Sequence, residues 1–136
     1  YKFGQMGDVL EARNDIYHGD YPMDPGIVRS FPDGSKFITS KSGSIFDKSL
    51  LFDRYIDLYA DNADFAFNNN GSIIYAAKPE SKRIDAIEYP SLSKVKSYNT
   101  KWIPFKIFRN GTTIVKAGMS TPGDQYTYFL VEKIEL

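Results

Sequence analysis

The chain has 136 residues, enough for one domain with a buried core, and its 42% hydrophobic and 15% aromatic content is typical of a globular protein rather than a disordered one. Its 17 basic and 17 acidic residues cancel, so net charge gives no basis for non-specific binding to nucleic acid or to an anionic membrane. The absence of cysteine excludes disulfides, thiolate nucleophiles and cysteine-ligated metals.

No apolar run approaches the roughly 20 residues that a transmembrane helix needs, so no membrane span is expected. The chain begins with Tyr1 rather than Met, which indicates a processed or excised product. A removed secretory signal is one explanation, and the compartment stays open between the cytosol and the outside of the cell.

Residues 1–25 are the least regular part of the chain. Short apolar alternations in residues 1–6 and 8–12 favour two short strands, although 8–13 fits a helical turn equally well. The prolines and glycines of residues 18–26 then mark a connecting loop.

From residue 26 onward one pattern occurs three times. An Asp-Gly or Asn-Gly pair, which suits a tight hairpin turn, is followed by a hydroxyl residue, an apolar pair, and then small residues or lysine. The glycines of the three copies are Gly34, Gly71 and Gly111, spaced 37 and 40 residues apart. Small residues late in a strand let a neighbouring sheet approach closely, so the pattern predicts stacked β-units.

The pattern divides a single all-β domain, residues 1–136, into an N-terminal segment and three repeats of about 40 residues, at 26–60, 61–101 and 102–136. The expected strands are 27–31, 36–41, 44–48 and 51–59 in the first repeat, 63–67, 72–78, 83–89 and 94–98 in the second, and 104–108, 113–117 and 126–136 in the third. A clear fourth strand is missing from the third repeat, and the N-terminal segment is the natural candidate to supply it.

The order of strand, turn, strand ending in small residues, loop, and then Ile84–Leu92 (IDAIEYPSL) resembles one four-stranded blade of a β-propeller. A period near 40 is expected for such blades. The resemblance covers about residues 26–136 and lacks the Gly-His and Trp-Asp pairs of WD repeats, so it indicates no subfamily. It implies an architecture with binding loops at one face, and it implies no activity.

Three blades cannot close a ring, because propellers have four to eight. Either two chains form a homo-oligomer of six blades, or the chain belongs to a longer or cleaved protein. A third alternative is a β-trefoil, in which three units of about 40 residues make one barrel.

Candidate chemistry is sparse. His18 lies in the Gly/Pro loop near acidic and tyrosine side chains, which would suit an acid–base or metal site, but a solvated loop histidine explains it as well. Asp57, Asp61 and Asp64 form an oxygen-rich cluster whose spacing does not match a Ca²⁺ loop, so an Asp/Asn-stabilised turn is favoured. No metal or cofactor is therefore predicted.

Trp102 at a loop-to-strand junction fits either an anchor for a partner or sugar, or a plug between the second and third repeats. The residues expected to bind are those of the loops that join repeats or the second and third strands within one: Trp102, Tyr21, His18, Asp20, Asp61, Asn62 and Lys101.

Repetition without a catalytic motif leads to one principal functional hypothesis, a non-catalytic binding or assembly module that recognises a protein or a glycan. One alternative is a hydrolase or lyase whose carboxylates meet at the central axis or barrel mouth. The other is a structural subunit that assembles through exposed strand edges.

Overall fold

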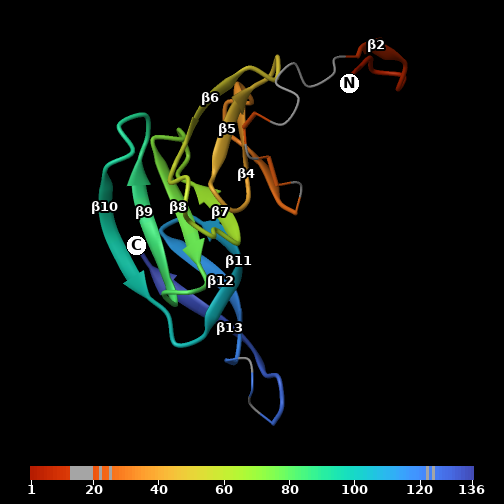
Figure 1. Cartoon of the computed structure of the whole chain (residues 1–136). Coiled ribbons are helices and arrows are strands. Elements are labelled where there is room, and N and C mark those ends of the chain that lie inside the picture. The colour runs from red at the N-terminus through yellow and green to blue at the C-terminus, as the bar shows by residue number, and fades with distance from the viewer. Residues whose placement is uncertain (13–19, 22, 25, 122, 124) are drawn as a thin grey trace.

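The computed structural model describes residues 1–12, 20–21, 23–24, 26–121, 123 and 125–136. This part of the chain is all-β, with 13 strands in four small antiparallel sheets (Figure 1). Within it, no helix has the length and apolar character needed to cross a membrane.

Each sheet is formed by strands that are consecutive in the sequence. A two-stranded hairpin pairs β1 (Lys2–Phe3) with β2 (Val9–Glu11). The first large sheet contains β3 (Val28–Ser30), β4 (Lys36–Thr39), β5 (Ser44–Asp47) and β6 (Phe52–Tyr55). The second contains β7 (Asp64–Phe67), β8 (Ile73–Lys78), β9 (Arg83–Glu88) and β10 (Lys94–Asn99), and the third β11 (Ile103–Asn110), β12 (Thr113–Met119) and β13 (Phe129–Glu135).

The three glycine turns form as the sequence predicts. Gly34, Gly71 and Gly111 have φ values of 68°, 74° and 60°, in the left-handed region where glycine carries no steric penalty. In the second turn the Asn70 side chain accepts hydrogen bonds from both the backbone N–H and the hydroxyl of Ser72. Such local bonds explain why an Asn-Gly-Ser sequence makes this turn.

The three large sheets pack face to face through two apolar clusters. The cluster between the first and second sheets consists of Phe31, Ile38, Ile45, Phe65, Ile74, Ala76 and Ile87. The cluster between the second and third consists of Ala66, Tyr75, Ala77, Ile84, Ala86, Ile107 and Ile114. Successive residues of a strand point to opposite faces, so β8 contributes alternately to both clusters. The central strands β8 and β9 of the second sheet are therefore buried on both faces, which explains their largely apolar sequences.

Two expectations about how the sheets are completed need correction. The N-terminal segment does not supply a fourth strand to the third sheet, because β1 and β2 pair with each other across a tight turn in which the Gly4 N–H donates to the Asp8 carbonyl at 2.8 Å. The third sheet consequently has three strands. In the described part of the chain no barrel closes, and the β-trefoil alternative lacks the closed barrel that it needs.

Candidate binding site at the loop end

The linker between the first two repeats lies against the β4–β5 loop. Lys41 and Asn62 exchange two backbone hydrogen bonds, from Lys41 N to Asn62 O at 2.8 Å and from Asn62 N to Lys41 O at 3.0 Å. The buried Asn62 amide also donates to the Lys41 carbonyl. Asn62, predicted to bind a ligand, thus holds the linker in place.

A hollow of about 340 Å³ lies beside this contact. It is lined by residues from the entry to the first sheet, the β4–β5 loop, the first linker and the start of β11: Asp24, Gly26, Ile27, Ser40, Lys41, Asp61, Asn62, Ala63, Phe105 and Lys106. Segments far apart in the sequence therefore meet at one place, and the predicted residues Asp61 and Asn62 are among them.

Asp24 is the best-held acid of this hollow. Lys41 Nζ lies 2.9 Å from its carboxylate, and the Gly26 N–H and the Ser40 hydroxyl each donate to it at 2.8 Å. The hydrogen bond from Lys41, followed by those from Gly26 and Ser40, lowers the pKa of Asp24 to about 2. Asp24 is therefore ionised at neutral pH and suited to holding the loop rather than to exchanging protons.

The second linker is anchored in a similar way. The Thr100 N–H donates to the Lys82 carbonyl of the β8–β9 loop at 2.7 Å, and Lys82 Nζ donates to the Thr121 hydroxyl at 2.9 Å. Trp102 is half-buried, with its ring edge-on to Tyr128 at 6.0 Å, whereas Lys101 is exposed. Both linkers therefore lie against the loop between the second and third strands of the preceding sheet.

Of the other predicted binding residues, Tyr21 and Asp20 do not line the hollow, and His18 is not among the residues that the structure describes. Tyr21 stacks on Phe52 of β6 with ring centroids 3.9 Å apart, on the outer strand of the first sheet. Asp20 is exposed, and His18 lies outside the described residues. The structure thus brings Asp61 and Asn62 together at the hollow, places Lys101 and Trp102 at the second linker, and leaves Tyr21 apart from both.

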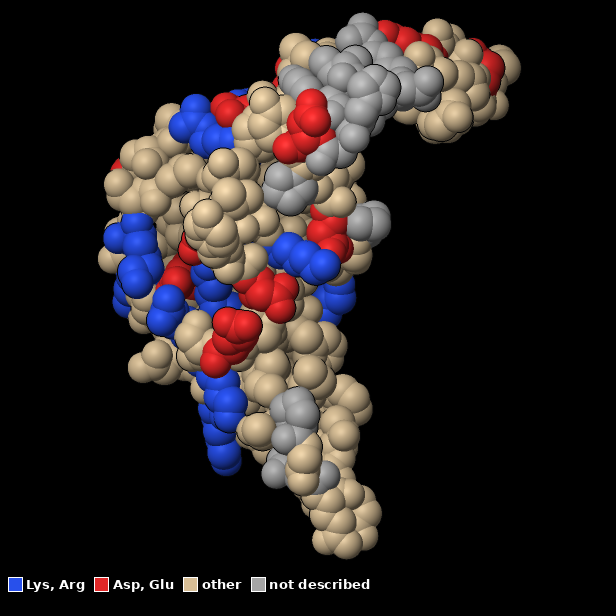
Figure 2. Space-filling view, viewed as in Figure 1, with Lys and Arg blue, Asp and Glu red and all other residues tan. Residues whose placement is uncertain are grey.

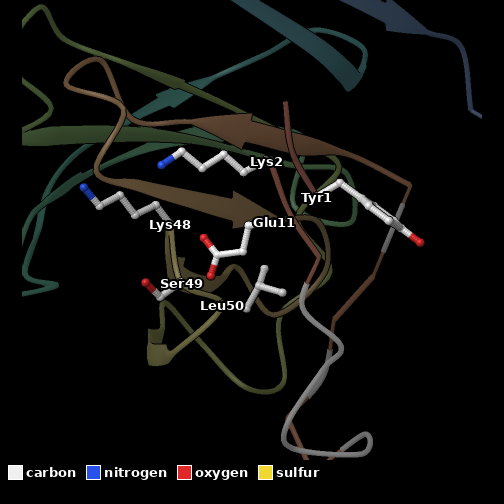
Figure 3. Close-up of a pocket in the computed structure, with 6 residues that line it drawn as sticks. All are labelled: Tyr1, Lys2, Glu11, Lys48, Ser49 and Leu50. Carbon is white, nitrogen blue, oxygen red and sulfur yellow. The ribbon is translucent and has the colours of Figure 1, made fainter. Parts of the chain in front are cut away.

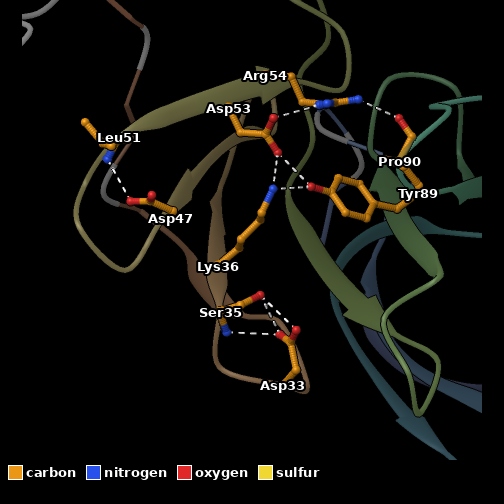
Figure 4. Close-up of polar contacts among 9 residues, drawn as sticks. All are labelled: Asp33, Ser35, Lys36, Asp47, Leu51, Asp53, Arg54, Tyr89 and Pro90. Carbon is orange, nitrogen blue, oxygen red and sulfur yellow. Dashed lines mark hydrogen bonds and ion pairs between the residues drawn. The ribbon is translucent and has the colours of Figure 1, made fainter.

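Sequence reasoning missed a polar cluster around Asp53 that joins the first sheet to the second (Figure 4). Asp53 Oδ2 lies 2.5 Å from Lys36 Nζ and accepts a hydrogen bond from the Tyr89 hydroxyl at 2.6 Å. Arg54 donates both to Asp53 and to the Pro90 carbonyl. Burial acts to raise the pKa of Asp53, but the hydrogen bonds from Lys36, Tyr89 and Arg54 outweigh it and lower this pKa to about 2.

A second missed interaction connects all three large sheets. The fully buried Asp64 of β7 accepts two hydrogen bonds at 2.8 Å from Arg29 of β3 and one at 3.0 Å from the Ile107 N–H of β11. The sequence placed Asp64 in an Asp/Asn-stabilised turn with Asp57 and Asp61. Asp57 does form a turn with Tyr59 and Ala60, but Asp64 lies in β7 and bonds across the sheets instead. Within the described residues, no group of three or more potential ligands is placed to hold a metal ion.

Elsewhere on the surface, one further hollow of about 440 Å³ lies between the N-terminal hairpin and the β5–β6 loop (Figure 3). Basic and acidic side chains are interspersed over the face of the molecule seen in Figure 2. That face carries no extensive area of a single charge.

Comparison with known proteins extends the fold assignment and not the function. No family model and no curated protein matches the chain by sequence. Among solved structures, it is similar to a chain titled Kuenenia stuttgartiensis hydrazine synthase, with a TM-score of 0.63 and 18% sequence identity. The similarity covers 82% of this chain and 35% of that one, so this chain spans only part of the length of the protein it matches. At this identity the similarity shows a shared all-β fold alone.

Proposed function

We propose that the chain is a non-catalytic binding or assembly module, in which three propeller-like sheets carry loops at one end that recognise a protein or a glycan. The proposal depends mainly on one observation: a buried carboxylate and two half-buried ones hold sheets and loops together. Asp24, Asp53 and Asp64 each accept several hydrogen bonds from fixed partners.

This use of the acids favours a scaffold over the hydrolase or lyase alternative. An acid catalyst at neutral pH needs a raised pKa, usually from burial or from a second carboxylate close by. The pKa values of Asp24 and Asp53 are instead lowered to about 2, and Asp64 is paired with the Arg29 guanidinium. Asp24 and Asp53 are therefore ionised at neutral pH and do not release or take up a proton there.

The loop end, where the linkers that carry Asp61 and Lys101 lie against the strand-connecting loops, has the properties of a recognition surface. Its backbone is fixed by hydrogen bonds between linkers and strand-connecting loops, such as the Lys41–Asn62 pair. The side chains of Asp61 and Lys101 nevertheless remain exposed. Because the backbone is already ordered, a partner would bind with little loss of conformational entropy.

The propeller-like interpretation of the sheets is part of the proposal. Its support is the stacking of successive antiparallel meanders, together with the meeting of their first strands β3, β7 and β11 at Asp64. Each linker leads directly from the last strand of one sheet to the first strand of the next, as blades of a propeller require.

An array of neutral and acidic oligosaccharides, incubated with the full chain and then analysed for cleavage, tests this function. We expect binding to one class of glycan without turnover, and at least a tenfold weaker affinity in Asp61→Ala and Lys101→Ala, since a hydrogen bond to a charged group contributes about 1.5–3 kcal/mol. Lys94→Ala, an exposed lysine on β10, is the charge-matched control and should bind normally.

Cleavage of any array member would favour the enzyme alternative instead. Binding that is lost equally in Lys94→Ala and Lys101→Ala would show that the loop end is not the recognition surface.

A further inference from the structure

The third sheet has a free edge at β13. Strands β11, β12 and β13 lie in that order, and no other strand of the described chain pairs with β13, whereas the first two sheets each have a fourth strand at the corresponding place. A free edge of seven residues is long enough to pair with a further strand.

The backbone of β13 shows which groups face this edge. Leu136 N–H donates to the Thr112 carbonyl and the Tyr128 carbonyl accepts from Ser120 N–H, both at 2.9 Å, so even-numbered residues bond to β12. Because backbone direction alternates along a strand, the N–H and C=O groups of the odd-numbered residues point away from β12. These residues are Phe129, Val131, Lys133 and Glu135, at the open edge.

The N-terminal hairpin, residues 1–12, is a short β-structure that makes no ladder with the large sheets. β1 and β2 pair only with each other, and the hairpin exposes five large apolar side chains: Tyr1, Phe3, Met6, Val9 and Leu10. The hollow of about 440 Å³ separates it from Lys48–Leu50 (Figure 3). Binding of the hairpin elsewhere would therefore break no strand pairing with the large sheets.

We infer that the N-terminal hairpin of one copy of this chain adds to the open edge of β13 in a second copy. Figure 1 shows the hairpin and β13 at opposite ends of the molecule, so a chain does not complete its own third sheet in this structure. An incoming strand would gain main-chain hydrogen bonds to Val131 and its odd-numbered neighbours, a mode of recognition that depends little on side-chain identity.

The inference rests on the assembly part of the proposed function and specifies which two surfaces make the contact between copies. Donor and acceptor are different surfaces, so the contact is head-to-tail and, unless a ring closes, produces open chains of copies. Glycan binding at the loop end does not depend on it, and the two proposals can fail separately.

Light scattering over a wide range of concentration tests the inference on the full chain and on two variants, each of which lacks one side of the contact. The full chain should show a mass that rises with concentration to at least two chains. A variant lacking residues 1–12 has no donor, and Val131→Pro has an edge N–H replaced by a proline ring, so each should remain monomeric by itself. Val131 is 71% exposed and its N–H makes no bond to β12, so this substitution leaves the core intact.

Mixing the two variants gives the sharper result. The deletion variant keeps an intact β13 and Val131→Pro keeps an intact hairpin, so together they should form a dimer with one chain of each. Asn99→Pro is the matched control, because Asn99 is an exposed residue of the outer strand β10 and its N–H points away from β9, as the bond from the neighbouring Thr100 N–H to the Lys82 carbonyl shows. This variant should assemble like the unaltered chain.

A full chain that is monomeric at every concentration would overturn the inference. So would assembly that persists without residues 1–12, or a mixture of the two variants that stays monomeric while circular dichroism shows both to be folded. Assembly blocked equally by Asn99→Pro and Val131→Pro would assign the contact to some other surface.

Discussion

At the scale of single residues, buried and half-buried polar side chains connect elements. Lys116 of β12 is fully buried, pairs with Glu132 of β13, and donates to the Trp102 carbonyl at 3.1 Å. Asp53 similarly binds Lys36 within its own sheet and Tyr89 of the next. A buried charge that lacks a partner costs several kcal/mol, so the fully buried Lys116 requires Glu132.

The lowered pKa of Asp53 predicts a dependence of stability on pH. The carboxyl has a pKa of about 3.9 when unfolded and about 2 when folded. Its contribution is therefore complete above about pH 4 and is lost as the pH falls toward 2. We expect Asp53→Asn to lower the free energy of unfolding by about 1–2 kcal/mol at pH 7, after allowance for solvent screening, and by much less near pH 2.

Urea unfolding across this pH range measures the effect. Glu80→Gln, which removes an exposed carboxylate, is the control and should change stability little at either pH. An Asp53→Asn variant whose deficit is the same at pH 7 and pH 2 would show that the carboxylate's charge is not what stabilises the cluster.

At the scale of the element, the hairpin turns share one backbone conformation but differ in their surroundings. Gly71 and Gly111 both have positive φ, at 74° and 60°. A Cβ atom at Gly71 would lie 3.2 Å from Cδ of Pro32 and 3.4 Å from Cδ1 of Phe31 in the first sheet, whereas one at Gly111 would meet no atom within 4 Å. The second turn is thus also a contact between sheets.

The matched pair Gly71→Ala and Gly111→Ala separates these two effects. Both should lose about 1–2 kcal/mol because alanine is strained at positive φ. Gly71→Ala should lose more, since Pro32 and Phe31 must move to accommodate the methyl group. Equal shifts in the thermal midpoint of the two variants would show that the turn has room to relax away from the first sheet.

At the scale of the whole molecule, the second sheet contributes side chains to both apolar clusters, one on each of its faces. Asp64 reinforces this arrangement, because its carboxylate binds Arg29 of the first sheet and the Ile107 N–H of the third. The three large sheets therefore share contacts at one point, and we expect them to unfold together.

Asp64→Asn tests the importance of that point. Removing one member of a buried charge pair costs about 3–5 kcal/mol, and the amide would keep only part of the hydrogen bonding. Asp85→Asn is the control, because Asp85 is also buried but bonds to Arg83 and Ser97 within a single sheet. Calorimetry should show a smaller loss for Asp85→Asn; a larger one would contradict a special role for Asp64.

Most of the local structure was predicted from the sequence. Asn-Gly and Asp-Gly pairs predicted the three hairpin turns, and most strands of the three repeats begin and end within a few residues of their expected bounds. The chief exception is β6, expected at 51–59 and observed as Phe52–Tyr55, because backbone and side-chain bonds to Asp57 form a turn at residues 57–60. The two short N-terminal strands were also predicted correctly.

The candidate site was predicted only in part. Asp61 and Asn62 were expected at a linker and do line the hollow, yet nothing in the sequence indicated that Asp24 and Phe105 would line it with them. Tyr21 was grouped with these residues because it lies in a loop, and nothing in the sequence indicated that its ring stacks on Phe52. The composition of a loop predicts that it is exposed to solvent. It does not predict which other loops will lie beside it in the folded chain.

The sequence by itself determined the all-β class, the hairpin turns and most strands of the repeats, because turns and side-chain alternation depend on residues close together in the chain. Only the tertiary structure decided that Arg29 pairs with Asp64, 35 positions away, and that residues 1–12 pair with each other rather than completing the third sheet. Those outcomes depend on the stacking of sheets and on competition between distant strands, and a local sequence pattern predicts neither.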